Sequence, residues 1–231
     1  MGRASAVRTV VLFGGSFDPP HRAHAALPDA VRAALPDAEC AWLLYIPAAR
    51  SPHKQRGPVA SDDQRLEMLR LAIKDVAHAA VWTDEVDRAT SGTPSFTIDT
   101  VRRARAWLDA SGGTRVTLRL LIGADQAAKF HTWREPRRII DIAEPLVMLR
   151  RPSESADELR AAMAAPSLWS AGELTGWDRR VVALDVDPVS ATEIRRLLAG
   201  SATERLSARG LVTTAVWKYI EDKGLYRAAH A

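Results

Sequence analysis

The most constraining feature of this chain is an apolar run that ends in a pair of glycines. Residues 10–13 read Val-Val-Leu-Phe, and residues 14–24 continue as Gly-Gly-Ser-Phe-Asp-Pro-Pro-His-Arg-Ala-His. This order predicts a buried strand, a tight turn and then a helix, because glycine lets the backbone turn sharply and proline cannot lie deep inside a helix. Open α/β sheets hold nucleotides at such strand-to-helix joins.

Two histidines, His21 and His24, are expected to share one face at the start of that helix. Side chains three residues apart are neighbours on a helix, and its first N–H groups attract phosphate. With the Ser16 hydroxyl and the backbone N–H groups of the turn, the imidazoles would form an anion cradle. Such a cradle suits attack of a phosphate oxygen on the α-phosphorus of a nucleoside triphosphate, which requires positioning and charge stabilisation but no protein nucleophile.

Simpler explanations of the same residues remain open. The histidines could be an exposed surface pair or metal ligands, although Asp18 is the only acid nearby and no cysteine is close. Asp18 is predicted to have a structural role, capping its own turn before the prolines. The helix dipole favours neutral imidazole and a bound triphosphate favours imidazolium, and the sequence leaves the choice open.

The length and composition favour one compact α/β domain over residues 1–231, which are 47% hydrophobic and 26% charged. Short apolar runs alternate with helical patterns, which predicts an open, mainly parallel sheet with helices on both faces. The expected strands are residues 8–13, 41–46, 80–83, 117–122, 146–149 and 181–184.

Three helices and one irregular region are also predicted. A capping box at Ser61 and Gln64 begins a helix over residues 61–75, which we interpret as scaffold, and further helices are expected over 98–110 and 213–223. Residues 150–180 contain Pro166, Gly172 and Gly176, and they are predicted to be a variable connection with one helix from Glu154 to Ala165. Residues 190–231 are expected to be a helical part that completes the active site.

Charge, cysteine content and missing motifs exclude several classes of protein. A formal net charge of +4 comes from scattered arginines without a long basic tract, so nucleic-acid binding is not expected. The single Cys40 rules out an internal disulfide. Neither a signal peptide nor a membrane span is apparent, and a cytoplasmic location is expected. Gly-x-Gly-x-x-Gly and P-loop motifs are lacking, which disfavours hydride transfer and P-loop ATPase activity.

Residues 14–24 resemble the Gly-Gly-x-Phe-Asp-Pro-x-His-x-Gly-His signature of the nucleotidyltransferase superfamily, and the remaining chain is similar to its nicotinate-nucleotide adenylyltransferase branch. The resemblance implies a Rossmann-like fold. It also implies that His24 stabilises the transition state at the α-phosphate and that His21 orients the triphosphate. Ala23 stands where the family has glycine and adds a methyl group near the nucleotide. The motif residues implied to bind ATP are Gly14, Gly15, Ser16, Phe17, His21 and His24.

A second segment, Gly123-Ala124-Asp125, follows the strand expected at 117–122. An acid just beyond a strand can accept hydrogen bonds from ribose hydroxyls. An N-cap on the next helix explains Asp125 equally well. The resemblance assigns Gly123 and Asp125 to the ATP site.

The resemblance also implies a site for nicotinate mononucleotide. Trp133 would stack on the pyridine ring, although tryptophan in such a domain is often plain core. Helix-start N–H groups near Thr97 and Arg134 would hold the carboxylate and favour the acid over the amide. Ser16 is assigned to this site as well. Phe96 replaces the tyrosine of the family's Ser-Tyr-Thr, and a serine or threonine cap is the simpler explanation there.

Two further anion-binding segments are similar to family elements. Lys54 ends the loop Pro47-Ala-Ala-Arg-Ser-Pro-His-Lys, which resembles a Pro-Pro-His-Lys element with Ser51 for the first proline, and a solvated lysine is the alternative. Residues 189–195, Val-Ser-Ala-Thr-Glu-Ile-Arg, resemble the superfamily's Ile-Ser-x-Thr-x-Ile-Arg in register. Ser190, Thr192 and Arg195 are thereby assigned to triphosphate binding, with Arg195 as a catalytic clamp on the leaving pyrophosphate. A helix cap beside an exposed arginine is the alternative.

Taken with these motifs, the resemblance implies transfer of AMP from ATP to nicotinate mononucleotide, with Mg²⁺ bridging the phosphates and no protein metal ligand assigned. Nicotinamide mononucleotide, phosphopantetheine or another phosphorylated acceptor is an alternative, and so is a nucleotide-binding sensor without turnover. The sequence leaves open whether the protein is a monomer or a homo-oligomer.

Overall fold

The computed structural model describes residues 7–49, 58–89, 95–112, 115–151, 155–185 and 189–227. The chain forms two compact units, each made of separated stretches. Unit 1 comprises Met1–Phe13, Leu27–Leu44 and Phe96–Pro188, and unit 2 comprises Gly14–Ala26, Tyr45–Ser95 and Val189–Ala231. Neither unit is a continuous piece of chain, so the protein is not a tandem pair of domains joined by one linker.

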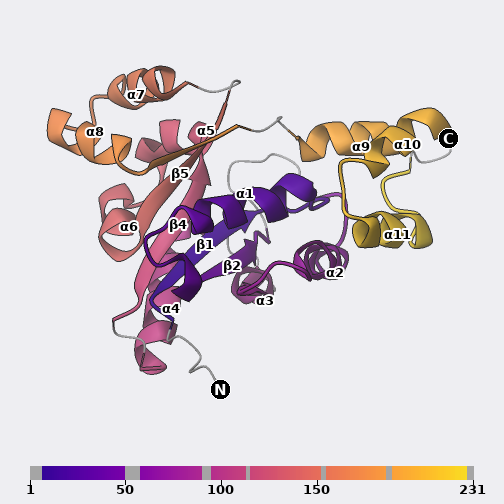
Figure 1. The fold of residues 1–231 in the computed structure, drawn as a ribbon, viewed down its shortest axis with the longest axis horizontal. Coiled ribbons are helices and arrows are strands. Elements are labelled where there is room, and N and C mark those ends of the chain that lie inside the picture. The colour runs from indigo at the N-terminus through magenta and orange to yellow at the C-terminus, as the bar shows by residue number, and fades with distance from the viewer. Residues whose placement is uncertain are drawn as a thin grey trace. The chain divides into compact units, whose positions relative to one another are not determined.

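A six-stranded sheet has the order β3-β2-β1-β4-β5-β6, and β1 with β4, β4 with β5 and β5 with β6 are parallel pairs. This is the strand order of dinucleotide-binding folds, which confirms the predicted Rossmann-like class. Figure 1 labels β1, β2, β4 and β5 of this sheet. All six predicted strands are present, with small shifts at their ends. They are β1 (Thr9–Gly15), β2 (Ala41–Pro47), β3 (Ala79–Val81), β4 (Thr117–Gly123), β5 (Glu144–Arg151) and β6 (Val181–Asp185).

The apolar runs form strands because both faces of the sheet are covered. Residues 10–13 of β1 and 146–149 of β5 are buried without interruption, as is typical of parallel strands between helices. The helices between Phe96 and Asp178 are α4 (Thr97–Ala110), α5 (Ala124–Ala128), α6 (Pro136–Ile142), α7 (Ala156–Ala164) and α8 (Ala171–Asp178), with a 3₁₀ turn, η3, at Phe130–Thr132. Here α4 packs on α6, and α5 packs on α7.

The region 150–180 is more regular than predicted. It contains α7, which was expected, and α8, which was not, and the two helices pack together (Figure 1). Gly172 and Gly176 lie inside α8 and lower its intrinsic helix propensity, which explains the wrong prediction. Two features outweigh them: a complete capping box at Ser170, which is local, and burial of Trp177 against Trp169, which is tertiary, with ring centroids 5.6 Å apart.

Glu173, in the capping box of α8, is expected to make the stability of the protein depend on pH. A hydrogen bond from Arg137, helped by those from Ser170, lowers the pKa of Glu173 from 4.5 to about 2. Because the folded pKa is depressed, this stabilisation is present above pH 4.5 and is lost as the pH falls toward 2. Glu173→Gln should lower the free energy of unfolding at pH 7 by at most about 1 kcal/mol, since the pair is partly exposed.

Urea unfolding of both proteins at pH 7 and pH 3 measures this effect, and the difference between them should shrink at pH 3. Glu158→Gln is the matched control, because Glu158 has the same third position in α7, where Ser155 accepts from its backbone N–H. A difference that stayed constant with pH would contradict an ionic contribution from Glu173.

Unit 2 contains the helices that follow the other strands. The predicted helix 61–75 is α2 (Asp62–Ile73), and its capping box at Ser61 and Gln64 is confirmed. The predicted helix 213–223 is α11 (Thr214–Asp222), which packs on α2, while α9 (Ala191–Ala199) packs on α10 (Ala202–Arg209). The short α3 spans Asp84–Arg88, α1 spans Arg22–Ala33 and runs from unit 2 into unit 1, and a 3₁₀ turn, η1, lies at Ala38–Cys40.

No helix within the described ranges has the length and apolar character needed to cross a membrane.

Candidate active site

The turn after β1 is shaped by Phe17. Phe17 has a positive φ of 48° and a buried side chain, and its ring lies 3.0 Å from where a Cβ on Gly15 would be. A Cβ at position 15 would make a tight contact with the ring, which would have to shift by a few tenths of an ångström, so the packing favours glycine there. Gly14 is exposed, and a Cβ there would have nothing within 4 Å among the described residues. The second glycine is thus favoured by packing, a reason that the motif alone does not reveal.

His21 and His24 are brought together as predicted. His21 precedes α1 and is buried, and the two imidazole rings stack with centroids 3.6 Å apart and an interplanar angle of 22°. The backbone N–H of His21 donates to Nδ1 of His24 at 3.1 Å. An accepting Nδ1 carries no proton, so a neutral His24 in this arrangement holds its proton on Nε2. The fold thereby selects the tautomer that donates through Nε2.

Asp18 has a structural role, but not the local one that the sequence predicted. The residue is 3% exposed, and its carboxylate accepts from the N–H groups of Val59 at 2.8 Å and Ala60 at 3.1 Å. The Tyr226 hydroxyl donates to the same carboxylate at 2.7 Å. These partners lie far along the chain, whereas a turn cap would bond its own neighbours. Asp18 therefore ties the motif to the start of α2 and to the carboxyl-terminal segment.

Arg65 is a motif contact that the sequence analysis missed. Its side chain on α2 is 0% exposed, and Nη1 donates to the carbonyl oxygen of Ser16 at 2.7 Å while Nη2 donates to Asp62 at 2.6 Å. Interpreting α2 as scaffold was correct but incomplete, because this helix also holds the motif backbone. The available signal was a charged residue within the apolar stripe, one position before Leu66 and four before Leu69.

The segment at residues 190–195 lies against the motif, as the resemblance implied. Nη1 of Arg195 donates to the carbonyl oxygen of Asp18 at 2.5 Å, and Nη2 donates to Oγ1 of Thr192 at 3.2 Å. Ser190 is the N-cap of α9, yet its side chain makes no capping hydrogen bond. The capping alternative for Ser190 is therefore wrong, and exposed hydroxyls at 190 and 192 flank the first turn of α9.

Unit 2 thus gathers most of the predicted phosphate-binding residues around one motif. Arg22 adds a further link, since its backbone N–H donates to the Leu211 carbonyl and its Nε to that of Val212. Ser16 and Ala23 are half-buried within the same segment. The predicted Lys54 lies outside the described residues.

The predicted ribose-binding residue Asp125 lies in unit 1, in the first turn of α5 after β4. Gly123 is the N-cap, so the N-cap alternative for Asp125 is wrong. The carboxylate is exposed and accepts from the Gln126 side chain at 2.9 Å. A Cβ on Gly123 would lie 2.8 Å from Oδ1 of Asp125, so the glycine gives this carboxylate its space.

The predicted nicotinate-binding residues also lie in unit 1. Thr97 begins α4, and Phe96 is the N-cap without a side-chain capping bond, so the predicted serine or threonine cap is absent there. The Arg134 guanidinium lies over the Phe96 ring, 5.2 Å from its centroid, which brings the two predicted carboxylate-binding segments together. Trp133 is half-buried beside Phe130, with ring centroids 4.7 Å apart, whereas the core tryptophans Trp169 and Trp177 are buried.

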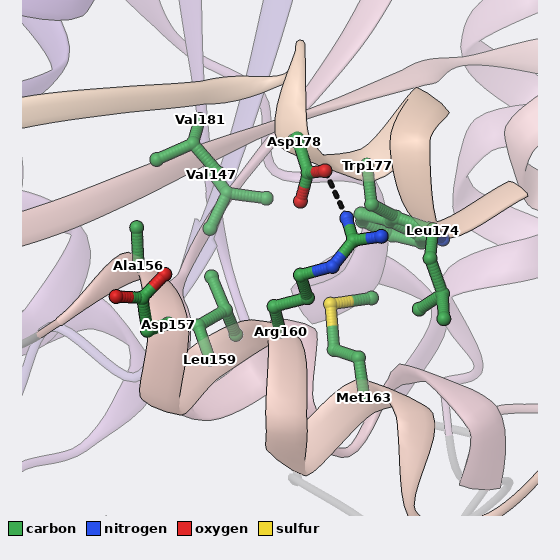
Figure 2. A pocket seen from close by; sticks show the side chains of 10 residues that line it. All are labelled: Val147, Ala156, Asp157, Leu159, Arg160, Met163, Leu174, Trp177, Asp178 and Val181. Atoms are coloured by element: carbon green, nitrogen blue, oxygen red, sulfur yellow. Dashed lines mark hydrogen bonds and ion pairs between the residues drawn. The ribbon is translucent and has the colours of Figure 1, made fainter. Parts of the chain in front are cut away.

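Unit 1 also contains a separate pocket of about 330 Å³ between α7, α8 and the paired strands β5 and β6 (Figure 2). Val147, Leu159 and Met163 make its walls apolar, and Arg160 is ion-paired with Asp178 across it. None of the predicted site residues lines this pocket. Since its arginine is already neutralised by an acid, the pocket lacks the cationic character of a phosphate site.

A metal site cannot be built from the described residues alone, because no three His, Cys, Asp or Glu side chains among them are clustered suitably. The carboxylate of Asp18, the acid within the motif, is occupied by backbone N–H groups and by Tyr226.

Comparison with known proteins identifies the family. Residues 12–197 match the family described as cytidylyltransferase-like. The chain is 37% identical to the "Probable nicotinate-nucleotide adenylyltransferase" of Pseudomonas putida strain GB-1, with 99% of each chain covered. It is 36% identical to a Pseudomonas aeruginosa protein of the same name, strain UCBPP-PA14, covering 96% of this chain and 99% of the relative.

A solved structure supports the same fold. The Plasmodium falciparum nicotinic acid mononucleotide adenylyltransferase complexed with NaAD superposes with a TM-score of 0.67 at 13% identity, covering 95% of this chain and 97% of that one. With the motif, the strand order and near-complete coverage of its relatives in agreement, this chain belongs to the nicotinate-nucleotide adenylyltransferase family within the cytidylyltransferase-like nucleotidyltransferases.

Proposed function

We propose that this protein transfers the AMP moiety of ATP to nicotinate mononucleotide and releases pyrophosphate, a step of NAD biosynthesis. The observation that carries the proposal is the convergence of His21, His24 and Arg195 on one motif in unit 2, in a chain of this family. The product would be nicotinate adenine dinucleotide, and a structural neighbour is described as complexed with NaAD.

The reaction needs no protein nucleophile. A phosphate oxygen of the mononucleotide attacks the α-phosphorus of ATP, a new P–O bond forms, and the bond from the α-phosphorus to the bridging oxygen of pyrophosphate breaks. The attacking phosphate is largely dianionic at pH 7, so it needs no general base. The protein must hold the two phosphates in line and stabilise the charge on the phosphoryl oxygens.

His24 has the geometry for the central role. Its Nδ1 accepts from the backbone, so Nε2–H can donate to a non-bridging oxygen of the α-phosphate as negative charge grows there. The stacked His21 would orient the triphosphate, together with the backbone N–H groups of Gly14, Gly15 and the Phe17 turn.

The leaving pyrophosphate would be received by the first turn of α9. The N–H groups of that turn, the hydroxyls of Ser190 and Thr192, and the Arg195 guanidinium are all suited to phosphate. Lys54 is expected to reach the β- or γ-phosphate. Mg²⁺ would enter with ATP as part of the substrate, held by phosphate oxygens and water, since the Asp18 carboxylate is already satisfied.

The acceptor and the adenosine ribose are assigned to residues of unit 1, with Ser16 also expected to contact the mononucleotide. Asp125 would accept from the ribose hydroxyls, next to Gly123. Trp133 would stack on the pyridine ring, and the start of α4 at Thr97, with Arg134, would bind the nicotinate carboxylate. A carboxylate-binding site of this kind favours the acid over the amide.

Replacing Trp133 tests the acceptor site. Trp133→Ala should raise the KM for nicotinate mononucleotide about tenfold, because aromatic stacking on a base contributes about 1–3 kcal/mol, while the KM for ATP stays nearly constant. Steady-state kinetics with each substrate varied in turn measures both values. Trp107→Ala is the matched control, since Trp107 is 57% exposed on α4. An unchanged KM for the mononucleotide would reject the stacking role.

An acceptor panel tests the whole proposal. Pyrophosphate release is measured with ATP, Mg²⁺ and, separately, nicotinate mononucleotide, nicotinamide mononucleotide and phosphopantetheine. Release with the nicotinate compound at the highest kcat/KM supports the proposed function. Preference for the amide would contradict the carboxylate-binding site, and no release with any acceptor would indicate a nucleotide-binding sensor. A cytoplasmic location, the lack of nucleic-acid binding and any homo-oligomer stay predictions.

A further inference from the structure

The Tyr226 backbone adopts a conformation that needs an explanation. Its φ is +58°, in a region that side-chain-bearing residues seldom occupy, and it follows Gly224 at +63° beyond the end of α11. Contacts made in the folded state offset such a conformation. Here they are the burial of the ring and the hydrogen bond from the Tyr226 hydroxyl to Oδ1 of Asp18 at 2.7 Å, between residues 208 positions apart.

The environment of Tyr226 keeps its hydroxyl a donor. The side chain is buried, and burial followed by the adjacent Asp18 charge raises the pKa of Tyr226. A hydroxyl that stays protonated can only satisfy the carboxylate by donating to it. Without this donor the buried carboxylate would keep only the N–H groups of Val59 and Ala60, and its less compensated charge would attract a nearby cation more strongly.

Arg195 is a charged donor close to Asp18. Nη1 of Arg195 donates to the carbonyl oxygen of Asp18 at 2.5 Å and lies 3.9 Å from Oδ2 of its carboxylate. In this arrangement the backbone of Asp18 anchors the guanidinium and the carboxylate is satisfied by Tyr226, Val59 and Ala60. A shift of Arg195 toward the carboxylate would direct its positive charge away from a phosphate ligand.

We propose that Tyr226 is a positioning residue that acts through Asp18, holding the Arg195 guanidinium where it can bind the pyrophosphate portion of ATP. This inference rests on the triphosphate role of Arg195 in the proposed function. The turn after α11, which contains Tyr226, would thereby contribute to phosphate binding. The contact is made by one hydroxyl, so Tyr226→Phe removes it while leaving the ring in place.

The test is a double-mutant cycle on binding, which requires no turnover. The dissociation constant of inorganic pyrophosphate in the presence of Mg²⁺ is measured by calorimetry for the full-length wild type, Tyr226→Phe, Arg195→Lys and the double variant. Tyr226→Phe is expected to weaken binding about tenfold. The double variant should bind no more weakly than Arg195→Lys alone, because Tyr226 acts through the arginine.

Independent losses that multiply in the double variant would overturn the proposal, as would wild-type affinity in Tyr226→Phe. Tyr219→Phe is the matched control, since it removes the same hydroxyl from α11, where burial and the charges of Glu67 and Asp63 raise the pKa of Tyr219. An equal loss in this control would mark a merely structural effect and overturn the proposal. If no acceptor supports turnover, the proposed reaction fails while this binding cycle still decides the role of Tyr226.

Discussion

His24→Ala is expected to lower kcat by about 10²–10³-fold while changing the affinity for ATP by less than about fivefold. One preorganised donor to a developing oxyanion contributes on this order, and its bond strengthens most in the transition state. In this protein the donor is prepared by the backbone, because the His21 N–H occupies Nδ1 of His24 and leaves the proton on Nε2. Steady-state kinetics together with ATP binding by calorimetry measures the two effects separately.

The variant His24→Asn distinguishes the loss of the Nε2–H donor from a disturbance of the turn around His21. The asparagine oxygen can take the place of Nδ1 and accept from the His21 N–H, but it provides no donor in the place of Nε2. This variant should therefore retain the thermal stability of the wild type and lose kcat as severely as His24→Ala. Equal losses of kcat and ATP affinity in both variants would contradict a transition-state role. Wild-type kcat in His24→Asn would assign the effect to the turn and not to the donor.

Arg195→Lys is expected to reduce kcat/KM for ATP by about 10²-fold. The guanidinium contacts the Asp18 carbonyl through Nη1 and Thr192 through Nη2, and its remaining donors would bind phosphate. A lysine ammonium is a compact charge without this planar fork, so it cannot bridge the motif, α9 and a ligand at once. The pyrophosphate concentration that half-saturates the reverse reaction should rise in parallel, which a pyrophosphorolysis assay measures.

The neighbouring Arg196 provides the matched control for that substitution. Arg196 lies on the same helix, more than half exposed, and pairs with Glu193 at 2.8 Å and Glu204 at 3.1 Å. Arg196→Lys should leave kcat/KM within about twofold, since exposed ion pairs contribute little. If the two substitutions had equal effects on kcat/KM, the assignment of Arg195 to pyrophosphate binding would be wrong.

Local patterns in the sequence were sufficient to predict the strands, most of the helices and the presence of the motif at residues 14–24. Continuous apolar runs predicted the parallel strands, and serine caps with a glutamine three residues later located α2. The proximity of the two stacked histidines could also be predicted, because a spacing of three residues at a helix start is a local property. The helix α8 was missed because its glycines are unfavourable locally, and the burial of Trp177 that stabilises it is a tertiary effect.

The glycine and histidine motif and the family resemblance could therefore be predicted from the sequence alone, since each motif is a short stretch of neighbouring residues. Only the tertiary structure decided what holds that motif in place. Asp18 is bonded to Tyr226 and Arg195, which are 208 and 177 residues away, and Arg65 reaches Ser16 from α2. No local pattern encodes such contacts, because a buried carboxylate selects its donors only after the chain has folded around it.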